Sequence, residues 1–462
     1  MASTWAGDAL RNRGRDGMVA PLPALRLPSL AIFRHRLYTQ FILSRWFATL
    51  AVQMQLTAMG WQVYDAARAE GQTIPQASFV LGMVGLSQFL PLLVLSLFGG
   101  QAADRYNRKY ILCACLTAKA VIAAGLAIVS FNHAPLIIPT VLTAAAFSGA
   151  INAFLPPAAS AFMPMLLPRE ELPQGIAWNS LAFQSGAIVG PAIGGLLYAF
   201  GASAAYGGTF LLLAAGVLLL IRMNAPRQAP VTDARTLGLI VEGLKYVWSN
   251  RIVLGAISLD LIVVLLGGAV ALLPVFARDI LHVGPGELGI LRAAMGAGAA
   301  IVALWIAAAP LRRHVGRWMF GSTIAFGLAT IVFGLSTNIW LTVVSLAIAG
   351  GVDMISVYVR QSLIQLATPD EMRGRVSAVS FVFISASNEL GDFESGVVAR
   401  IVGPVTAVVV GGALAVSAST LWMRLFPQLR KADGFEPALA APSQKQTIQT
   451  PRVETSPAGG AQ

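Results

Sequence analysis

The segment GGQAADRYNRK, residues 99–109, is a short and densely charged stretch between two long apolar runs. Residues 79–98 contain no charged side chain, and the only charge in residues 110–131 is Lys119. Runs of about twenty apolar residues are long enough to cross a bilayer as helices. We therefore predict a tight turn at a membrane surface, where glycines allow close backbone approach and Arg105, Arg108 and Lys109 face anionic lipid.

Composition extends this interpretation to the whole chain. Of the 462 residues, 56% are hydrophobic and only 11% are charged, whereas soluble domains carry about 25% charged residues. The 45 glycines are typical of closely packed membrane helices. The net charge of +11 is not gathered into basic clusters interleaved with aromatic residues, so nucleic acid is not an expected partner. The composition predicts an all-α membrane protein.

Residues that commonly hold metals or cofactors are sparse. Cys113 and Cys115 are two apart, a spacing that points them in different directions on a helix. The four histidines are scattered near predicted loops, and no phosphate-cradling loop is present. We expect no metal, no cofactor, no catalytic residues and no drive by ATP.

Hydropathy predicts twelve transmembrane helices in two groups of six. The predicted spans are 37–64, 77–98, 110–131, 136–155, 176–200, 204–222, 252–276, 288–308, 318–335, 340–365, 376–398 and 402–425. The resulting parts are a tail at 1–29, a six-helix bundle at 30–222, a connector at 223–250, a second six-helix bundle at 251–425 and a disordered tail at 426–462. Most Lys and Arg residues fall before the first span, in loops after even-numbered spans, or in the last tail, which predicts cytoplasmic termini.

Two further patterns support this division. In the connector, apolar residues recur at helical spacing between 237 and 248, which predicts an amphipathic helix on the membrane surface. The two bundles also repeat one another at a constant displacement: Pro168, Glu170, Gly190 and Gly195 recur as Pro369, Glu371, Gly391 and Gly396. A duplication of six helices is typical of alternating-access carriers with a site between the halves.

With these patterns, residues 30–425 resemble the major facilitator superfamily. The segment from Gly100 to Lys109 looks like that superfamily's signature between spans two and three, with Asn107 in place of a glycine; the corresponding loop at 309–317 is decayed. By this resemblance the signature residues brace the cytoplasmic ends of the two halves and set the balance between inward and outward states. The alternative is a role limited to topology and lipid contact. The predicted gating residues are Gly100, Asp104, Arg105, Arg108 and Lys109.

A second resemblance concerns the direction of transport. Span five contains a pattern similar to the antiporter signature that is typical of exporters, formed by Gly186, Gly190, Pro191, Gly194 and Gly195. Together with LPREEL at 167–172 and DEMRGRV at 370–376, it is similar to the enterobactin exporter-like branch. An arginine found in span four of many drug/proton antiporters is replaced by Ala145, so proton coupling through that arginine is not available.

Charged side chains within predicted spans are costly and are therefore candidates for function. Glu389 and Asp392 are three residues apart, hence neighbours on one helix, and could share a proton because close like charges repel. By resemblance, spans one, four, seven and ten line a central cavity, which Arg45, Asp260, Asp353 and Arg360 would face. Fixed structural pairs, such as Arg45 with an acid of the opposite half, remain an alternative, and Lys119 and Arg292 are interpreted as scaffold residues. The candidates for substrate or proton handling are Arg45, Asp260, Asp353, Arg360, Glu389 and Asp392.

These observations favour a monomeric secondary transporter of the inner membrane, working by alternating access. The expected activity is export of a small organic molecule, either a siderophore or a drug-like compound, in exchange for protons. One alternative is an importer or facilitator on the same fold, because a fold does not fix direction. A second is a membrane receptor or enzyme without transport activity.

Overall fold

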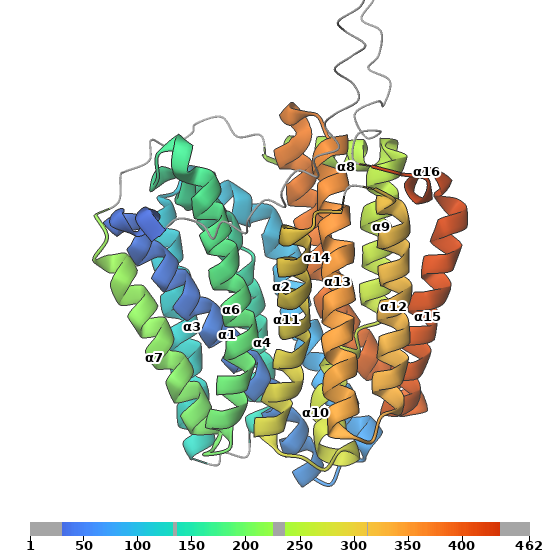
Figure 1. Ribbon diagram of the computed structural model, residues 1–462. Coiled ribbons are helices and arrows are strands. Elements are labelled where there is room, and N and C mark those ends of the chain that lie inside the picture. The colour runs from blue at the N-terminus through green and yellow to red at the C-terminus, as the bar shows by residue number, and fades with distance from the viewer. Residues whose placement is uncertain (1–29, 133–135, 225–235, 312, 435–462) are drawn as a thin grey trace, which may run out of the picture.

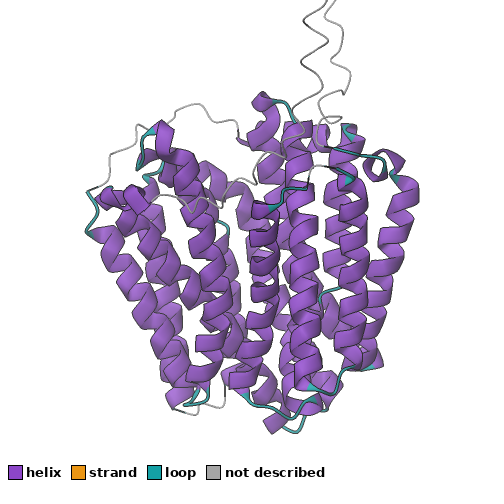
Figure 2. Cartoon of the chain, viewed as in Figure 1, coloured by secondary structure: helices purple, strands orange, loops and turns teal. Residues whose placement is uncertain are grey.

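The structure, a computed structural model, describes residues 30–132, 136–224, 236–311 and 313–434; the rest is drawn as a thin grey trace (Figure 1). The predicted tail at 1–29, the first part of the connector and the chain after 434 lie outside these residues. In the described part, the chain consists of helices joined by short loops, as Figure 2 shows. The predicted all-α fold is confirmed.

The first half comprises six long helical segments. They are α1 (Arg36–Ala69), α2 (Ile74–Arg105), α3 (Arg108–Phe131), α4 (Ile137–Asn152) with its continuation α5 (Leu155–Phe162), α6 (Leu172–Tyr198) and α7 (Ala202–Ile221). Short 3₁₀ turns precede α1 and α6: η1 (Leu30–Arg34), η2 (Met163–Met165) and η3 (Arg169–Glu171).

The second half follows the connector helix α8 (Thr236–Ser249). It contains α9 (Arg251–Leu266), η4 (Ala269–Leu272), α10 (Leu273–Val275), the π-helical η5 (Phe276–Ile280), α11 (Pro285–Ala308), α12 (Val315–Leu335), α13 (Ile339–Ala367), α14 (Asp370–Val402), α15 (Pro404–Leu425) and α16 (Pro427–Arg430). In this part of the chain α14 occupies the position that α6 has in the first half, as the sequence repeat predicts.

Ten helical segments among the described residues are long and apolar enough to cross a membrane. Two further predicted spans correspond to α1 and α14, which have 34 and 33 residues but are not among the ten. Both carry polar and charged side chains along their length, which lowers their mean hydropathy. The total of twelve spans therefore stays a prediction.

The molecule has two distinct ends (Figure 1). We call the end with α8 and α16 the α8 end, and the opposite end, with α10 and η5, the α10 end. Figure 1 shows α1 and α7 leaning away from the second half toward the α8 end. The two halves thus approach one another toward the α10 end.

Two seams join the halves, α2 with α14 and α6 with α11. Glycines at both seams bring backbones into contact: a methyl group on Gly82 would lie 2.9 Å from the Cα of Gly396, and one on Gly289 would lie 2.6 Å from the Pro191 carbonyl oxygen. Small residues at such interfaces let membrane helices approach closely. We refer to these interfaces as the α2–α14 seam and the α6–α11 seam.

Two membrane segments differ in length and continuity from the predicted spans, because proline or glycine residues interrupt their helices. The span predicted at 136–155 runs on through α5, which begins beside Pro156 and Pro157, residues that lack a backbone N–H. The span predicted at 252–276 breaks at Gly267 and Gly268 and continues through η4, α10 and η5. A glycine pair has no side chain to pack and favours the break.

The disorder predicted for residues 426–462 is wrong for the start of that segment. Residues 427–434 are structured, with Leu429 fully buried among residues of α9 and α12. The Gly316 N–H donates a hydrogen bond to the Ala432 carbonyl at 3.0 Å, which holds this segment against the start of α12. Burial of one leucine and this backbone pairing explain its order.

Candidate transport site

The halves are joined at the α10 end by four charged side chains and one tyrosine, which we call the α10-end latch: Tyr64, Asp65, Arg68, Arg278 and Asp279. The Arg278 guanidinium lies 2.7 Å from the Asp65 carboxylate, and Arg68 lies 3.2 Å from Asp279. The Tyr64 hydroxyl also donates to Asp279. Because α1 belongs to the first half and η5 to the second, the latch closes this end of the molecule.

The salt bridges described at the α8 end have a different arrangement. Glu171, just before α6, pairs with Arg34 and, at 2.9 Å, with His35, all within the first half. Arg375 at the start of α14 pairs with Glu242 of the connector helix at 2.5 Å. These contacts hold elements of one half together, so the ion pairs that bridge the two halves lie at the α10 end in the described part of the chain.

The predicted gating signature lies at the α8 end and ties together helices of the first half. Arg108 donates to the Ala161 carbonyl at 3.0 Å, and Lys109 donates to the Met223 carbonyl at 2.6 Å. The Asn107 side chain accepts from the Lys109 N–H, capping α3. Arg108 also lies 3.9 Å from Asp104. In this conformation Arg108 and Lys109 cap the ends of α5 and α7, and the predicted bracing between the halves stays a prediction.

The two glycines of this signature have different surroundings. A methyl group on Gly100 would meet no atom within 4 Å, whereas one on Gly99 would collide with the Ala153 carbonyl oxygen. The close approach between α2 and the end of α4 therefore depends on Gly99.

The antiporter-type motif on α6 uses two faces. Methyl groups on Gly186, Gly190 and Gly194 would lie 2.8, 2.6 and 2.7 Å from atoms of Thr49, Gln53 and Met54 on α1. On its other face, Gly195 touches the backbone of Pro285 and Gly289, and the Pro191 carbonyl also faces Gly289. The motif thus packs α6 onto α1 within the first half and onto α11 across the α6–α11 seam.

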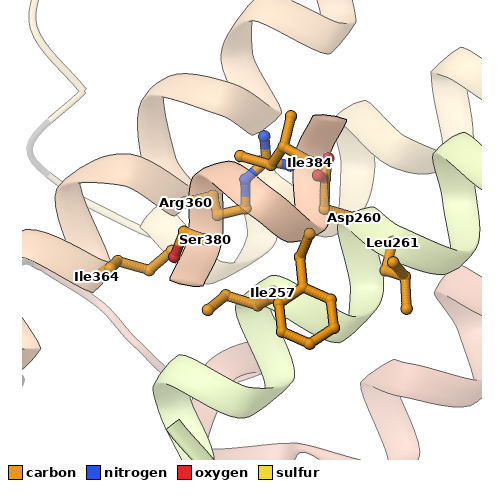
Figure 3. Close-up of a pocket in the computed structure, with 8 residues that line it drawn as sticks. Ile257, Asp260, Leu261, Arg360, Ile364, Ser380 and Ile384 are labelled. Carbon is orange, nitrogen blue, oxygen red and sulfur yellow. Dashed lines mark ion pairs between the residues drawn. The ribbon is translucent and has the colours of Figure 1, made fainter. Parts of the chain in front are cut away.

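Asp260 and Arg360 form an ion pair inside the second half. Asp260 is on α9 and Arg360 on α13, and their side chains are only 8% and 5% exposed. They line a small pocket together with Ser380 and Ile384 of α14 (Figure 3). The structure thus brings together two residues that the sequence identified separately.

Two other predicted site residues have no such partner. Arg45, on α1 of the first half, and Asp353, on α13 of the second, have neither an ion pair nor a side-chain hydrogen bond with any described residue. The alternative in which Arg45 pairs with an acid of the opposite half is therefore not found among the described residues. Among the described residues, the charges of Arg45 and Asp353 are thus not compensated in the way that those of Asp260 and Arg360 are.

The remaining acids, Glu389 and Asp392, lie on α14 at the α2–α14 seam. A methyl group on Gly85 of α2 would be 2.6 Å from the Glu389 carbonyl oxygen and 2.8 Å from the Asp392 Cβ. Lys119 on α3, only 3% exposed, interacts electrostatically with Glu389. Arg292 on α11 interacts in the same way with Asp392. We call these four residues the seam charge cluster.

Sequence reasoning had not joined Lys119 and Arg292 to the carboxylates. The signal that could have found them is charge balance, because a cation isolated in an apolar span needs a counter-charge. Arg292 also reaches the first half, since its Nη2 lies 3.3 Å from the position of a methyl group on Gly60. The cluster thus spans both halves.

Two helical halves, joined at glycine seams and carrying buried charges at their interface, define a membrane transporter of the major facilitator fold. The profile of the family described as transmembrane secretion effector matches residues 28–455, and the chain belongs to this family.

Curated relatives and solved structures agree with this assignment. The enterobactin exporter of Citrobacter koseri is 27% identical over 361 residues, covering 77% of this chain and 84% of the relative. That of Escherichia coli strain SMS-3-5 is 26% identical over 371 residues, covering 79% and 87%. The inward open xylose transporter of E. coli has a TM-score of 0.66 at 12% identity, covering 88% of this chain and 99% of the other. A bacterial homologue of the lysosomal transporter Spinster, inward-facing and unoccupied, has a TM-score of 0.65 at 14% identity, covering 85% and 98%.

The likeness to the solved structures shows the fold, and the family match shows the class. The chain is a multi-pass membrane protein and a secondary transporter rather than an enzyme. Its partners are a small-molecule substrate and the lipid bilayer.

Proposed function

We propose that the protein exports a small organic molecule of the siderophore class across the inner membrane, in exchange for protons and by alternating access. The names of the curated relatives support the substrate class and the direction. The excess of basic residues at the α8 end supports a cytoplasmic location for that end. The closed α10 end is then the periplasmic one, and the conformation is inward-facing.

The observation that carries proton coupling is the position of the seam charge cluster. Glu389 and Asp392 lie on adjacent turns of α14, directly against the backbone of α2 in the other half. Alternating access must separate these two helices at the α10 end and bring them together again. When this interface opens, the two carboxylates move from a buried environment with compensating charges nearby to one that is exposed to water. Their protonation is therefore linked to the conformation of the transporter.

The unpaired charges Arg45 and Asp353 are proposed to recognise the substrate. A buried charge without a partner is unfavourable, so a ligand that supplies the opposite charge gains binding energy there. The charges of Asp260 and Arg360 already compensate one another inside one half. We assign it to holding α9 against α13 rather than to the substrate.

The gating role of the signature at the α8 end is also proposed. Asp104 lies on α2, the helix that forms the α2–α14 seam, and its exposed position leaves it near the end that must close in the outward-facing state. Replacing Asp104 by Asn should lower the transport rate about two- to fivefold and leave the substrate affinity unchanged. Rates in proteoliposomes at saturating substrate measure this, and an unchanged rate removes the gating role.

Transport by inverted membrane vesicles tests the proposed function. The probe is a catecholate siderophore, with an amphiphilic cationic dye as the second compound. An acidic vesicle interior should drive accumulation of the siderophore, because protons leave as substrate enters. Loss of substrate from preloaded vesicles under the same gradient indicates import instead. Vesicles that handle neither probe, although the protein is present and folded, would contradict the proposed substrate class.

A further inference from the structure

We propose that the connector helix α8, together with the first residue of α9, is a docking surface for anionic phospholipids of the cytoplasmic leaflet. Val241, Leu244 and Trp248 enter the headgroup region of the bilayer, and Lys245 and Arg251 bind the phosphate groups. We base this on the part of the proposed function that places the α8 end in the cytoplasm. The sequence predicts a helix at the membrane surface, and the structure adds which face meets lipid and why that lipid is anionic.

The rotation of α8 about its own axis is fixed by contacts with the second half, where it packs against α14 and α9. The Tyr246 hydroxyl donates a hydrogen bond to the Ala367 carbonyl at 2.6 Å. A methyl group on Gly243 would lie 3.0 Å from the Arg375 carbonyl oxygen. Val247, one turn after Gly243, is only 2% exposed. Gly243, Tyr246 and Val247 therefore face the protein.

The opposite face of α8 is apolar and exposed. Val241 is 63% exposed, Leu244 is 36% exposed and Trp248 is 67% exposed. These residues are three and four positions apart, so they form one stripe along the helix. At 3.6 residues per turn, this stripe lies roughly half a turn away from Gly243 and Val247. Tryptophan and aliphatic residues in such a stripe are typical of helices that lie in the bilayer interface.

The start of α9 sets the depth of this stripe. α8 ends at Ser249 and α9 begins at Arg251, with only Asn250 between them. The segment from Arg251 to Ile280 is long and apolar enough to cross a membrane. Trp248 is three residues before that segment, which is at most about 10 Å of extended chain. The stripe therefore lies at the level of the lipid headgroups.

The charges beside the stripe favour anionic lipid. Glu242 pairs with Arg375 of α14, so its charge is compensated within the protein. Lys245 and Arg251 are exposed, and neither forms an ion pair with any residue that the structure describes. Basic side chains next to a membrane span attract the anionic lipids of the cytoplasmic leaflet. We therefore expect this surface to prefer phosphatidylglycerol to phosphatidylcholine.

Spin labels on the full-length protein in phosphatidylglycerol nanodiscs test the position of the apolar face. In a background with Cys113→Ala and Cys115→Ala, labels at Val241→Cys and Leu244→Cys should be more accessible to oxygen than to a water-soluble nickel chelate. A label at Ser249→Cys, on a more polar side of α8, is the matched control and should favour the chelate.

Two results would overturn the assignment of this face to lipid. Labels at Val241→Cys and Leu244→Cys that are as accessible to the chelate as the control would place the face in water. Labels shielded from both oxygen and the chelate would show that protein covers the face instead.

A titration tests the preference for anionic headgroups. An environment-sensitive fluorophore at Leu244→Cys reports binding as phosphatidylglycerol is added to the protein in neutral detergent micelles. Lys245→Gln and Arg251→Gln should each raise the mole fraction of lipid needed for half-saturation about fivefold. Lys245→Arg, which retains the charge, should stay close to the wild type. Lys431→Gln removes an exposed lysine after α16 and is the control for net charge, with no change expected.

The charge assignment fails if phosphatidylcholine binds as well as phosphatidylglycerol, or if Lys245→Gln and Arg251→Gln bind as the wild type does. Neither measurement involves transport, so the two proposals fail separately. Lipid docking without export driven by a pH gradient would leave the surface standing and contradict the proposed function. Export by a protein whose α8 face lies in water would contradict the surface alone.

Discussion

The α2–α14 seam and the α6–α11 seam are pseudo-symmetric solutions to the same packing problem. In both, glycines let two membrane helices touch at their backbones, through Gly82 and Gly396 in one and Gly195 and Gly289 in the other. Their chemistry differs. The α2–α14 seam carries Glu389 and Asp392, whereas the α6–α11 seam joins glycine and proline backbone, the Ile188 side chain and one uncharged hydrogen bond, from Gln184 to the Gly296 carbonyl.

This difference separates two requirements of a transporter. Close glycine contacts make both seams able to close, and this property was duplicated with the fold. Charge at the interface makes closure sensitive to protons, and one seam is enough for this. A change in backbone packing should therefore affect both seams alike, whereas a change in charge should matter at only one.

The largest expected effect comes from a charge pair that lies at neither seam. Arg360→Met leaves the buried Asp260 without its partner, which should lower the free energy of unfolding by about 3–5 kcal/mol. Replacing both partners, with Asp260→Leu and Arg360→Met, should recover most of that loss. Unfolding of the purified protein by heat measures both. A stable single variant would show that this pair is not structural and belongs with the charges at the interface.

Added volume at the seams should have the next largest effect, and the same one on each side. Gly85→Ala and Gly195→Ala should each disfavour the closed α10 end by about 1–3 kcal/mol, because their methyl groups meet backbone atoms. Distances between spin labels at the α10 ends of α1 and α11 report the closed fraction. Gly125→Ala is the matched control, since its methyl group would meet nothing within 4 Å. If Gly85→Ala lowers the closed fraction and Gly195→Ala does not, the two seams are not equivalent.

Replacing the two carboxylates at the α2–α14 seam by neutral amides should uncouple transport from the proton gradient. The double variant with Glu389→Gln and Asp392→Asn should lose about tenfold or more of its gradient-driven accumulation, within the usual range of coupling energies. Exchange of substrate without a gradient should persist and should no longer vary with pH. Glu394→Gln, on the same helix but a different face, is the control. Accumulation at the normal level in the double variant would mean that protons are coupled elsewhere.

The smallest effect is expected at the α10-end latch, whose charges are partly exposed to water. Asp279→Asn weakens contacts to both Tyr64 and Arg68 and should shift the population away from the closed state about two- to fivefold. Asp65→Arg or Arg278→Asp alone should weaken closure of the α10 end. The double variant, in which the two charges have changed places, should restore it. Spin-label distances again measure the outcome, and failure of the double exchange would indicate that backbone contacts alone close this end.

Much of this architecture could be predicted because it depends on local patterns. Apolar run lengths, the loop signature at 99–109 and the repeated glycines are visible in the chain without any tertiary contact. The interruption at Gly267 and Gly268 was missed because the surrounding residues remain apolar, so hydropathy does not register a break.

The pairing of charges could not be predicted from the same patterns. Asp260 and Arg360 meet only because α9 packs against α13, and Glu389 lies against Gly85 only because α14 packs on α2 of the first half. In the sequence, Asp260 and Arg360 are isolated charges within two different predicted transmembrane spans. Which acid compensates which base is a property of helix packing, and residue spacing within one helix carries no information about it.

The short helix α16 has a practical consequence for anyone who modifies this protein. Leu429 fills a place in the core beside α9 and α12, and Gly316 pairs with Ala432. A shortened chain should therefore retain residues through 434, because a cut at 426 opens a hole under two membrane helices. A fluorescent or affinity label joined after 434 would sit at the α8 end on the outer side of the second half (Figure 1), remote from the latch. It offers a handle for following the protein while both seams are free to move.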